Sequence, residues 1–286
     1  MSSLPAQGIA ECSSLDVPNS VVGIDFSGAK NACKKIWVSK GTIKSNILHI
    51  HESRRIADYM QKGHRQVSRN QCLIKLENLI AGEQHAAFGL DFPFSLPDLL
   101  LDNEDWHAFV RQFPERYKTP EQFRESCRNA TQNKEFKRRT EKENKAPFCA
   151  YNLWLFKQTY FGIRDVLHPL AIGKKACILP VQSCEKGKPW VLEICPASTL
   201  KQEGVYIPYK GKTEVKQQSR SQILEYLSTR GVSVSSDVVE IAIENSEGDA
   251  LDSVIAAFAT YRALQEPEKL TTMCPAIYKR EGYIFV

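Results

Sequence analysis

Short runs of apolar residues separated by turn-forming residues open the chain, and this pattern is typical of β-strands. The first run covers residues 21–26, and two more cover residues 32–38 and 43–51, on either side of Ser39-Lys40-Gly41. Runs of this length that are bounded by glycine and polar residues favour strands over helices. Because tight connections join antiparallel neighbours, the pattern predicts an antiparallel meander of three strands.

The hydrophobic period changes to that of a helix after the meander and then returns to that of a strand. Within residues 71–80, apolar side chains recur at helical spacing, and Gly82 follows as an expected C-cap. Residues 86–90 form a continuous apolar run that ends at Asp91 and Pro93. A strand that is reached through a helix is expected to lie parallel to the strand before the helix. We therefore predict that residues 86–90 lie parallel to the first strand.

A long segment rich in charged and aromatic residues then interrupts the strand pattern. Thr119-Pro120-Glu121-Gln122 has the composition of a helix start, with an N-cap threonine, a proline at the first helical position and a glutamine in the capping-box position. Residues 151–167 are apolar nearly all round, which predicts a buried helix. We interpret residues of about 102–171 as a helical insertion over the edge of the sheet.

The strand pattern resumes after this insertion, and helices follow. Strands are predicted at residues 175–182 and 189–194, around a turn at 185–188, and helices at residues 214–228, 238–244 and 250–264. This order of elements indicates an α/β fold. We expect residues 1–19 to be a flexible tail and residues 20–286 to form one domain, interrupted by the insertion.

Composition limits the class of protein without identifying it. The chain has 286 residues, of which 42% are hydrophobic and 25% charged, as in ordinary globular proteins. No apolar run approaches about 18 residues, so no membrane-spanning helix is expected. The start of the chain lacks the pattern of a secretory signal, and the nine cysteines include no CxxC pair. These features favour a reducing cytoplasm, with no disulfide-linked partner and no zinc knuckle.

Acidic residues follow the apolar elements in a regular way. Asp25, Asp91 and Glu193 each lie at the end of an apolar run, and Asp249 and Asp252 lie at the start of the last predicted helix. Strand ends and helix starts of this kind meet at one edge of an α/β sheet. Each acid alone also has a structural interpretation, as an Asx-turn, a helix cap or a solvated strand residue.

Carboxylates that meet in this way are suited to hold divalent cations. Two Mg²⁺ or Mn²⁺ ions about 4 Å apart need several oxygen ligands and open positions for phosphate oxygens. Asp249 and Asp252 are three residues apart, so both project from one helix face near the positive end of the helix dipole. One ion would activate water and the other would stabilise the departing oxygen.

Basic residues provide candidate contacts to nucleic acid, and the net charge of +5 permits such a partner. Lys30 follows the first strand and is a candidate phosphate contact. Arg138 and Arg139 are candidates as well, because arginine binds phosphate with two parallel hydrogen bonds. Glutamates are interleaved with this basic stretch, so a solvated helix face is an equally good interpretation of it.

Several short motifs resemble those of one known family, the predicted ribonuclease H-like nucleases that are described as a domain of unknown function. The motifs are Gly23-Ile24-Asp25-Phe26-Ser27-Gly28, Gly89-Leu90-Asp91-Phe92-Pro93, Leu192-Glu193-Ile194-Cys195-Pro196, Gly248-Asp249-Ala250-Leu251-Asp252-Ser253-Val254-Ile255-Ala256-Ala257 and Glu281-Gly282-Tyr283-Ile284, with Arg138-Arg139-Thr140-Glu141 and Gln158-Thr159-Tyr160-Phe161-Gly162-Ile163 in the insertion. Their order and spacing extend over nearly the whole chain after Ser20.

The resemblance implies an RNase H-like fold, with a five-stranded mixed sheet, three strands antiparallel and then two parallel, flanked by helices. It implies a metal-binding set made of Asp25, Asp91, Asp249 and Asp252, with Glu193 as a further residue of the family's own motif. The Asp-x-x-Asp spacing on the last helix is similar to that of the Holliday-junction resolvase branch, which includes RuvC-like enzymes.

The function expected from these observations is metal-dependent hydrolysis of phosphodiester bonds in DNA or RNA by two metal ions. The loop Asp25-Phe26-Ser27-Gly28-Ala29-Lys30 also resembles the first phosphate loop of sugar kinases and actin-like ATPases, although the second Gly-rich loop of those proteins is missing. A third alternative is a non-catalytic module that binds nucleic acid. The sequence leaves open the choice of DNA or RNA, the shape of the substrate and the oligomeric state.

Overall fold

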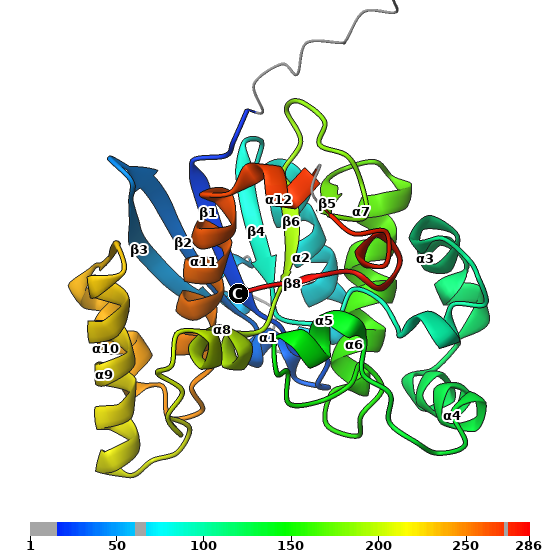
Figure 1. The fold of residues 1–286 in the computed structure, drawn as a ribbon. Coiled ribbons are helices and arrows are strands. Elements are labelled where there is room, and N and C mark those ends of the chain that lie inside the picture. Colours follow the sequence, from blue (N-terminus) through cyan, green and yellow to red (C-terminus); the bar gives the residue numbers. More distant parts are fainter. Residues whose placement is uncertain (1–15, 61–66, 272–273) are drawn as a thin grey trace, which may run out of the picture.

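The structure is a computed structural model, and it describes residues 16–60, 67–271 and 274–286 (Figure 1). The strands are β1 Ser20–Asp25, β2 Trp37–Lys44, β3 Ile47–Arg55, β4 Ala86–Leu90, β5 Cys177–Leu179, β6 Trp190–Ile194, β7 Val232–Val234 and β8 Ile284–Phe285. The helices are α1 Ala32–Lys35, α2 Arg69–Gly82, α3 Trp106–Arg116, α4 Pro120–Ala130, α5 Arg139–Glu143, α6 Phe156–Gly162, α7 His168–Ile172, α8 Pro196–Gln202, α9 Glu214–Thr229, α10 Ser236–Glu244, α11 Asp249–Leu264, α12 Pro267–Thr271 and α13 Tyr278–Glu281. Two 3₁₀ turns, Ile56–Tyr59 and Asp98–Leu100, and a π-helical turn, Ile163–Leu167, complete the described elements.

One mixed sheet with helices on both faces forms the centre of the molecule. Its strand order is β5-β6-β4-β1-β2-β3-β7, and β8 pairs with β6. β1, β2 and β3 are antiparallel neighbours, whereas β4 lies parallel to β1 and β6 lies parallel to β4. The predicted meander and the predicted parallel return are therefore confirmed. The expected count of five strands was wrong, because β5, β7 and β8 extend the sheet to eight.

The predicted boundaries of the second strand and of the turn after it were wrong. Residues 32–38 are divided between α1 and the start of β2, so the apolar residues at 32 and 33 belong to a single helical turn. Ser39-Lys40-Gly41 lies inside β2, where the register with β3 shifts between Lys40 and Gly41. The turn is made instead by Ser45 and Asn46, which both have positive φ, as a two-residue hairpin turn requires.

Most of the later elements have the predicted type, helix or strand, but several differ from the prediction in length. The helices predicted at 214–228, 238–244 and 250–264 correspond to α9, α10 and α11. The buried helix predicted at 151–167 begins at Phe156 and continues through the π-helical turn into α7. The turn predicted at 185–188 does not close a hairpin, because β5 and β6 are parallel. The described elements between β4 and β5 are all helical, and this segment contains residues 102–171, which we continue to call the insertion.

The alternation of side chains along β1 divides the core into two layers. Val22 and Ile24 pack with α2 and the insertion helices on one face of the sheet. Val21 packs on the opposite face, in the layer that contains α11. Successive residues of a strand point to opposite faces, so Gly23 and Asp25 lie on the same face as Val21. The final residue of β1 is thereby directed toward α11.

Two glycines let α11 approach the sheet closely (Figure 1). A Cβ atom on Gly23 would lie 2.1 Å from the Ser253 carbonyl oxygen and 2.2 Å from the Ala257 nitrogen. A Cβ atom on Gly89 of β4 would lie 2.0 Å from Thr260 Oγ1. These contacts are with or beside helix backbone, which cannot move alone. The glycines therefore determine how near α11 comes to β1 and β4.

We expect Gly23→Ala to lower the free energy of unfolding by about 3 kcal/mol, because the added methyl group meets helix backbone and forces α11 away from the sheet. Gly82→Ala at the end of α2 is the matched control, because its added methyl group meets nothing within 4 Å. The control is expected to be neutral or slightly stabilising. Urea denaturation of both variants measures the difference, and equal stabilities would contradict the close packing of α11.

Among the described residues, no helix combines the length and apolar character that crossing a membrane requires.

Candidate metal centre

Two of the predicted acids are neighbours because of the strand register. β1 ends at Asp25, and Asp91 follows the last residue of β4. The two strands are parallel, with Gly23 opposite Gly89, so the position two residues further on each strand lies on the same face. The backbone N–H of Asp91 donates to the Ile24 carbonyl at 3.0 Å, which extends the pairing to this point. Asp25 and Asp91 are thus held side by side, facing α11.

The other two acids come from the first turn of α11. Gly248 precedes the helix with φ of 82°, a conformation that favours glycine, and the Asn245 side chain accepts the Ala250 N–H at 3.2 Å. Asp249 and Asp252 then project from one face of the helix. The side chain of Asp252 is 4% exposed and that of Asp249 is 15% exposed.

The four carboxylates lie close enough to disturb one another's ionisation. Burial and the charges of Asp252, Asp249 and Asp91 raise the pKa of Asp25 well above its ordinary value. Burial, followed by the charge of Asp252, raises the pKa of Asp91 to about 8. Burial also raises the pKa of Asp249 to about 6, with a further contribution from Asp252. The structure thus brings together Asp25, Asp91, Asp249 and Asp252 from β1, β4 and α11.

Two residues that the sequence analysis missed complete this cluster. The Lys210 Nζ atom lies 2.6 Å from Asp252 Oδ2 and 4.0 Å from Asp249 Oδ1. Burial opposes its charge, but the nearby carboxylates, Asp252 foremost, raise the pKa of Lys210 above its usual range. The Tyr209 hydroxyl donates a hydrogen bond to Asp252 Oδ1. No sequence motif marks this loop, which joins α8 to α9.

Two of the four acids, Asp252 and Asp249, are paired with the Lys210 ammonium in this conformation. Within residues 16–60, 67–271 and 274–286, no three His, Cys, Asp or Glu side chains lie close enough together to hold one metal ion. The chemistry of the cluster nevertheless fits Mg²⁺ or Mn²⁺, because carboxylate oxygens are the ligands that both ions prefer. The Lys210 ammonium is a stand-in cation that marks where positive charge is already bound. A divalent cation would need these side chains to close around it.

Glu193, the fifth predicted acid, lies on the other face of the sheet. Glu193 is paired with Leu90 of β4, so its side chain lies on the same face of the sheet as Leu90. Asp91 is the next residue and points to the opposite face. The Glu193 carboxylate receives two hydrogen bonds from Arg138 and one from the Phe94 N–H at 2.9 Å. Its charge is therefore neutralised by the insertion, and the position does not support the predicted catalytic role.

Arg138 is at the centre of a buried ion-pair cluster and is itself 0% exposed. Its Nη1 atom donates to Glu193 Oε2 and to the Glu281 carbonyl, both at 2.8 Å. Its Nε atom donates to Glu141 Oε1 at 2.9 Å, so the guanidinium faces two carboxylates. The prediction that Arg138 contacts nucleic acid does not fit this position, because the guanidinium already donates to Glu141, Glu193 and the Glu281 carbonyl. Arg138 instead fastens the insertion to β6.

The two other predicted contacts to nucleic acid are accessible. Lys30 is exposed in the loop after β1. Arg139 is 63% exposed and forms an ion pair with Glu143 at 2.8 Å on the same helix. Exposed pairs of this kind exchange partners at little cost. Both residues therefore remain candidates for phosphate contacts.

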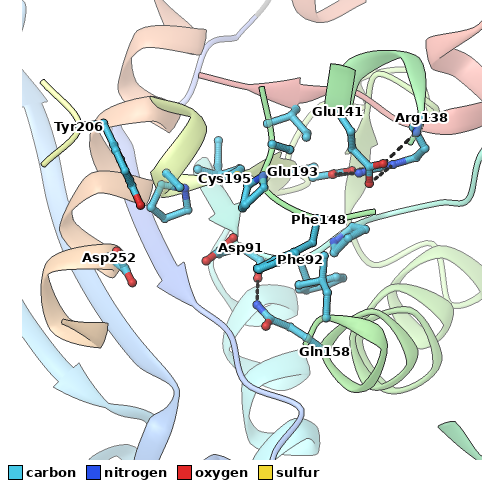
Figure 2. A pocket seen from close by; sticks show the side chains of 18 of the residues that line it. Asp91, Phe92, Arg138, Glu141, Phe148, Gln158, Glu193, Cys195, Tyr206 and Asp252 are labelled. Carbon is cyan, nitrogen blue, oxygen red and sulfur yellow. Dashed lines mark hydrogen bonds and ion pairs between the residues drawn. The ribbon is translucent and has the colours of Figure 1, made fainter. Parts of the chain in front are cut away.

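A pocket of about 470 Å³ lies beside the acids and between the insertion and the sheet (Figure 2). Asp91, Asp252 and Lys210 line one side of it, and Phe148, Gln158 and Arg138 line the side of the insertion. The Gln158 side chain donates to the Asp91 carbonyl oxygen and so connects α6 to the end of β4. Figure 2 shows Asp252 and the carboxylate of Asp91 facing the same space, with the Arg138 cluster set apart from them. The insertion thus forms one wall of the candidate site.

The comparisons with known proteins give limited information. No protein family model and no curated protein matches the chain. A crystal structure of the yeast mitochondrial Holliday junction resolvase Ydc2 aligns with 90% of this chain and 86% of its own chain, with 13% sequence identity and a TM-score of 0.41. This TM-score is too low to assign the fold family or the activity, so the function rests on the geometry of the site.

Proposed function

We propose that this protein is a metal-dependent nuclease with an RNase H-like fold, which hydrolyses phosphodiester bonds of DNA or RNA. The observation that carries the proposal is the meeting of four carboxylates at one end of the sheet, beside an open pocket. The proposed ligands of Mg²⁺ or Mn²⁺ are Asp25, Asp91, Asp249 and Asp252. The central strand order β3-β2-β1-β4-β6, with its antiparallel and parallel parts, supports the fold assignment.

The electrostatics of the cluster explain why a cation is needed. Carboxylates that are partly removed from water and face one another are unfavourable when all are charged, and this raises the pKa of Asp25, Asp91 and Asp249. Two divalent cations, when bound, would supply Lewis-acid stabilisation of the phosphate and a water molecule acidic enough to attack it. The positive end of α11 adds to the field that holds the anionic side chains in place.

The protein's own residues position this chemistry. Asp25 and Asp91 are carried by central strands and Asp252 by a buried helix start, so their carboxylates are held on rigid elements. The pocket beside them is large enough for a nucleotide of the substrate, with Phe148 and Tyr206 at its walls. Lys30 and Arg139 are exposed and available for contacts to backbone phosphates. The partner that we propose is therefore nucleic acid.

The proposal is tested by incubating the purified protein with labelled single-stranded DNA, duplex DNA, a four-way junction, RNA and an RNA–DNA hybrid. We expect cleavage of at least one substrate with Mn²⁺ or Mg²⁺ and none with EDTA. A protein that leaves every substrate intact in the presence of metal contradicts the proposal. Salt-sensitive binding without cleavage would favour a binding module, and stabilisation by ATP with Mg²⁺ would favour a phosphotransferase.

A further inference from the structure

In the structure Lys210 forms ion pairs with two of the four proposed metal ligands. Its ammonium lies 2.6 Å from Asp252 Oδ2 and 4.0 Å from Asp249 Oδ1, and its charge also acts on Asp25. A cation at this point neutralises part of the negative charge that α11 and β1 bring together. An incoming divalent cation would need the same place, because Asp252, which binds the Lys210 ammonium, is also a proposed metal ligand.

The backbone on both sides of Lys210 is fixed by a buried arginine. Arg220, which is 2% exposed, donates from Nη1 to the Tyr209 carbonyl at 2.7 Å and to the Gly211 carbonyl at 3.1 Å. Its Nε atom donates to the Ile243 carbonyl at 2.7 Å, which ties the loop to α10. The loop therefore presents Lys210 to the acids from a fixed point.

The side chain of Lys210 itself is not confined. It is 55% exposed, whereas its partner Asp252 is 4% exposed. The stem passes over Gly248, where an added Cβ atom would lie 3.0 Å from Lys210 Cγ. Rotation about the bonds of the stem can move the ammonium into the pocket, which Lys210 also lines, without any change in the backbone. Because the backbone is fixed and the side chain can rotate, the Lys210 ammonium can leave Asp252 and return to it.

We propose that Lys210 is a displaceable internal cation of the metal site. In the metal-free protein its ammonium neutralises Asp252 and Asp249 and keeps the carboxylates together. A divalent cation that takes Asp252 Oδ2 and Asp249 Oδ1 as ligands occupies the place of this ammonium, so it binds there only when the ammonium leaves. Lys210 therefore stabilises the metal-free protein and weakens its affinity for metal. This inference rests on the proposed function and adds a residue that controls its metal dependence.

The test compares Lys210→Met with Lys212→Met, which removes the same charge from an exposed position of the same loop. Mn²⁺ is titrated by calorimetry into the metal-free wild-type protein and both variants. We expect Lys210→Met to bind Mn²⁺ about tenfold more tightly than wild type, because no ion pair has to be broken. Lys212→Met is expected to remain within about twofold of wild type. In EDTA, Lys210→Met is expected to melt at a lower temperature than Lys212→Met.

The outcomes separate this inference from the proposed function. Equal Mn²⁺ affinities for Lys210→Met and Lys212→Met overturn the role of Lys210 and leave the nuclease proposal standing. If the wild-type protein and both variants bind no Mn²⁺, the metal-dependent function itself fails, and the role of Lys210 fails with it.

A second measurement uses the wild-type protein and does not depend on a folded variant. After reductive methylation with ¹³C, the NMR signal of dimethylated Lys210 is followed during addition of Mg²⁺. We expect a clear change of the Lys210 signal as the ammonium leaves Asp252, and little change for Lys212. A Lys210 signal that does not respond to saturating Mg²⁺ also overturns the inference.

Discussion

Asp25→Asn is expected to reduce metal-dependent cleavage by about 10³-fold or more without lowering stability. Loss of a ligand carboxylate removes several kcal/mol of transition-state stabilisation, and each 1.36 kcal/mol corresponds to about a factor of ten in rate. Burial and the neighbouring acids disfavour the charged form of Asp25, since they raise its pKa. Asparagine has nearly the same shape and carries no charge. The variant is therefore expected to melt in EDTA at the same temperature as the wild type or higher.

Asp237→Asn is the matched control, since Asp237 is exposed on α10. It is expected to keep full activity and stability. Rates are measured on the best substrate of the panel with Mn²⁺, and melting temperatures are measured in EDTA. An Asp25→Asn protein that cleaves within about tenfold of wild type would remove Asp25 from the proposed ligands. Loss of activity together with a large fall in melting temperature would point to a structural role instead.

Arg138→Met is expected to lower the free energy of unfolding by about 3–5 kcal/mol, because it leaves buried carboxylates without their cation. Glu193 and Glu141 are 2% and 1% exposed, and the Arg138 guanidinium hydrogen-bonds to both. Methionine matches the length of the arginine stem but donates no hydrogen bond. Urea denaturation gives the change in the free energy of unfolding directly.

Two further variants show whether the lost cation is the cause. Arg139→Met removes an exposed arginine one residue further on and is expected to change stability by less than about 1 kcal/mol. Glu193→Gln added to Arg138→Met removes one of the unpaired charges, so part of the lost stability is expected to return. A loss of less than about 1 kcal/mol in Arg138→Met would mean that the buried cluster does not hold the insertion to β6.

Acidic residues that look alike in the sequence have different roles in these two predictions. Asp25 and Asp91 face α11 and take part in a cluster with excess negative charge. Glu193 and Glu141 face the insertion and share the buried guanidinium of Arg138. In the proposed function the first group binds divalent cations in addition to Lys210, whereas the charges of the second group are balanced in part by the fully buried Arg138. Binding of Mn²⁺ should therefore be sensitive to Asp25 and only indirectly to Glu193.

Much of the architecture could be predicted from the sequence because its determinants are local. The apolar runs at β1 and β4, and the apolar face of α11, identify elements by their periods of two and 3.6 residues. Residues at the ends of parallel strands lie at one edge of the sheet in any register. The location of Asp25 and Asp91 at one edge of the sheet therefore follows from the sequence pattern. The short strands β7 and β8 carry too few residues to show a period.

The tertiary structure alone decided which acids face one another and which cations they meet. Glu193 ends an apolar run as Asp91 does, but its pairing with Leu90 places it on the opposite face, and a shift of one residue would have reversed this. Arg138 and Lys210 lie 55 and 42 residues from their partners Glu193 and Asp252, so no local pattern could indicate either pair. The sequence by itself determined most of the longer elements and the edge where the acids gather. Strand register and long-range packing determined the grouping, since the face of a side chain depends on its neighbours in the sheet.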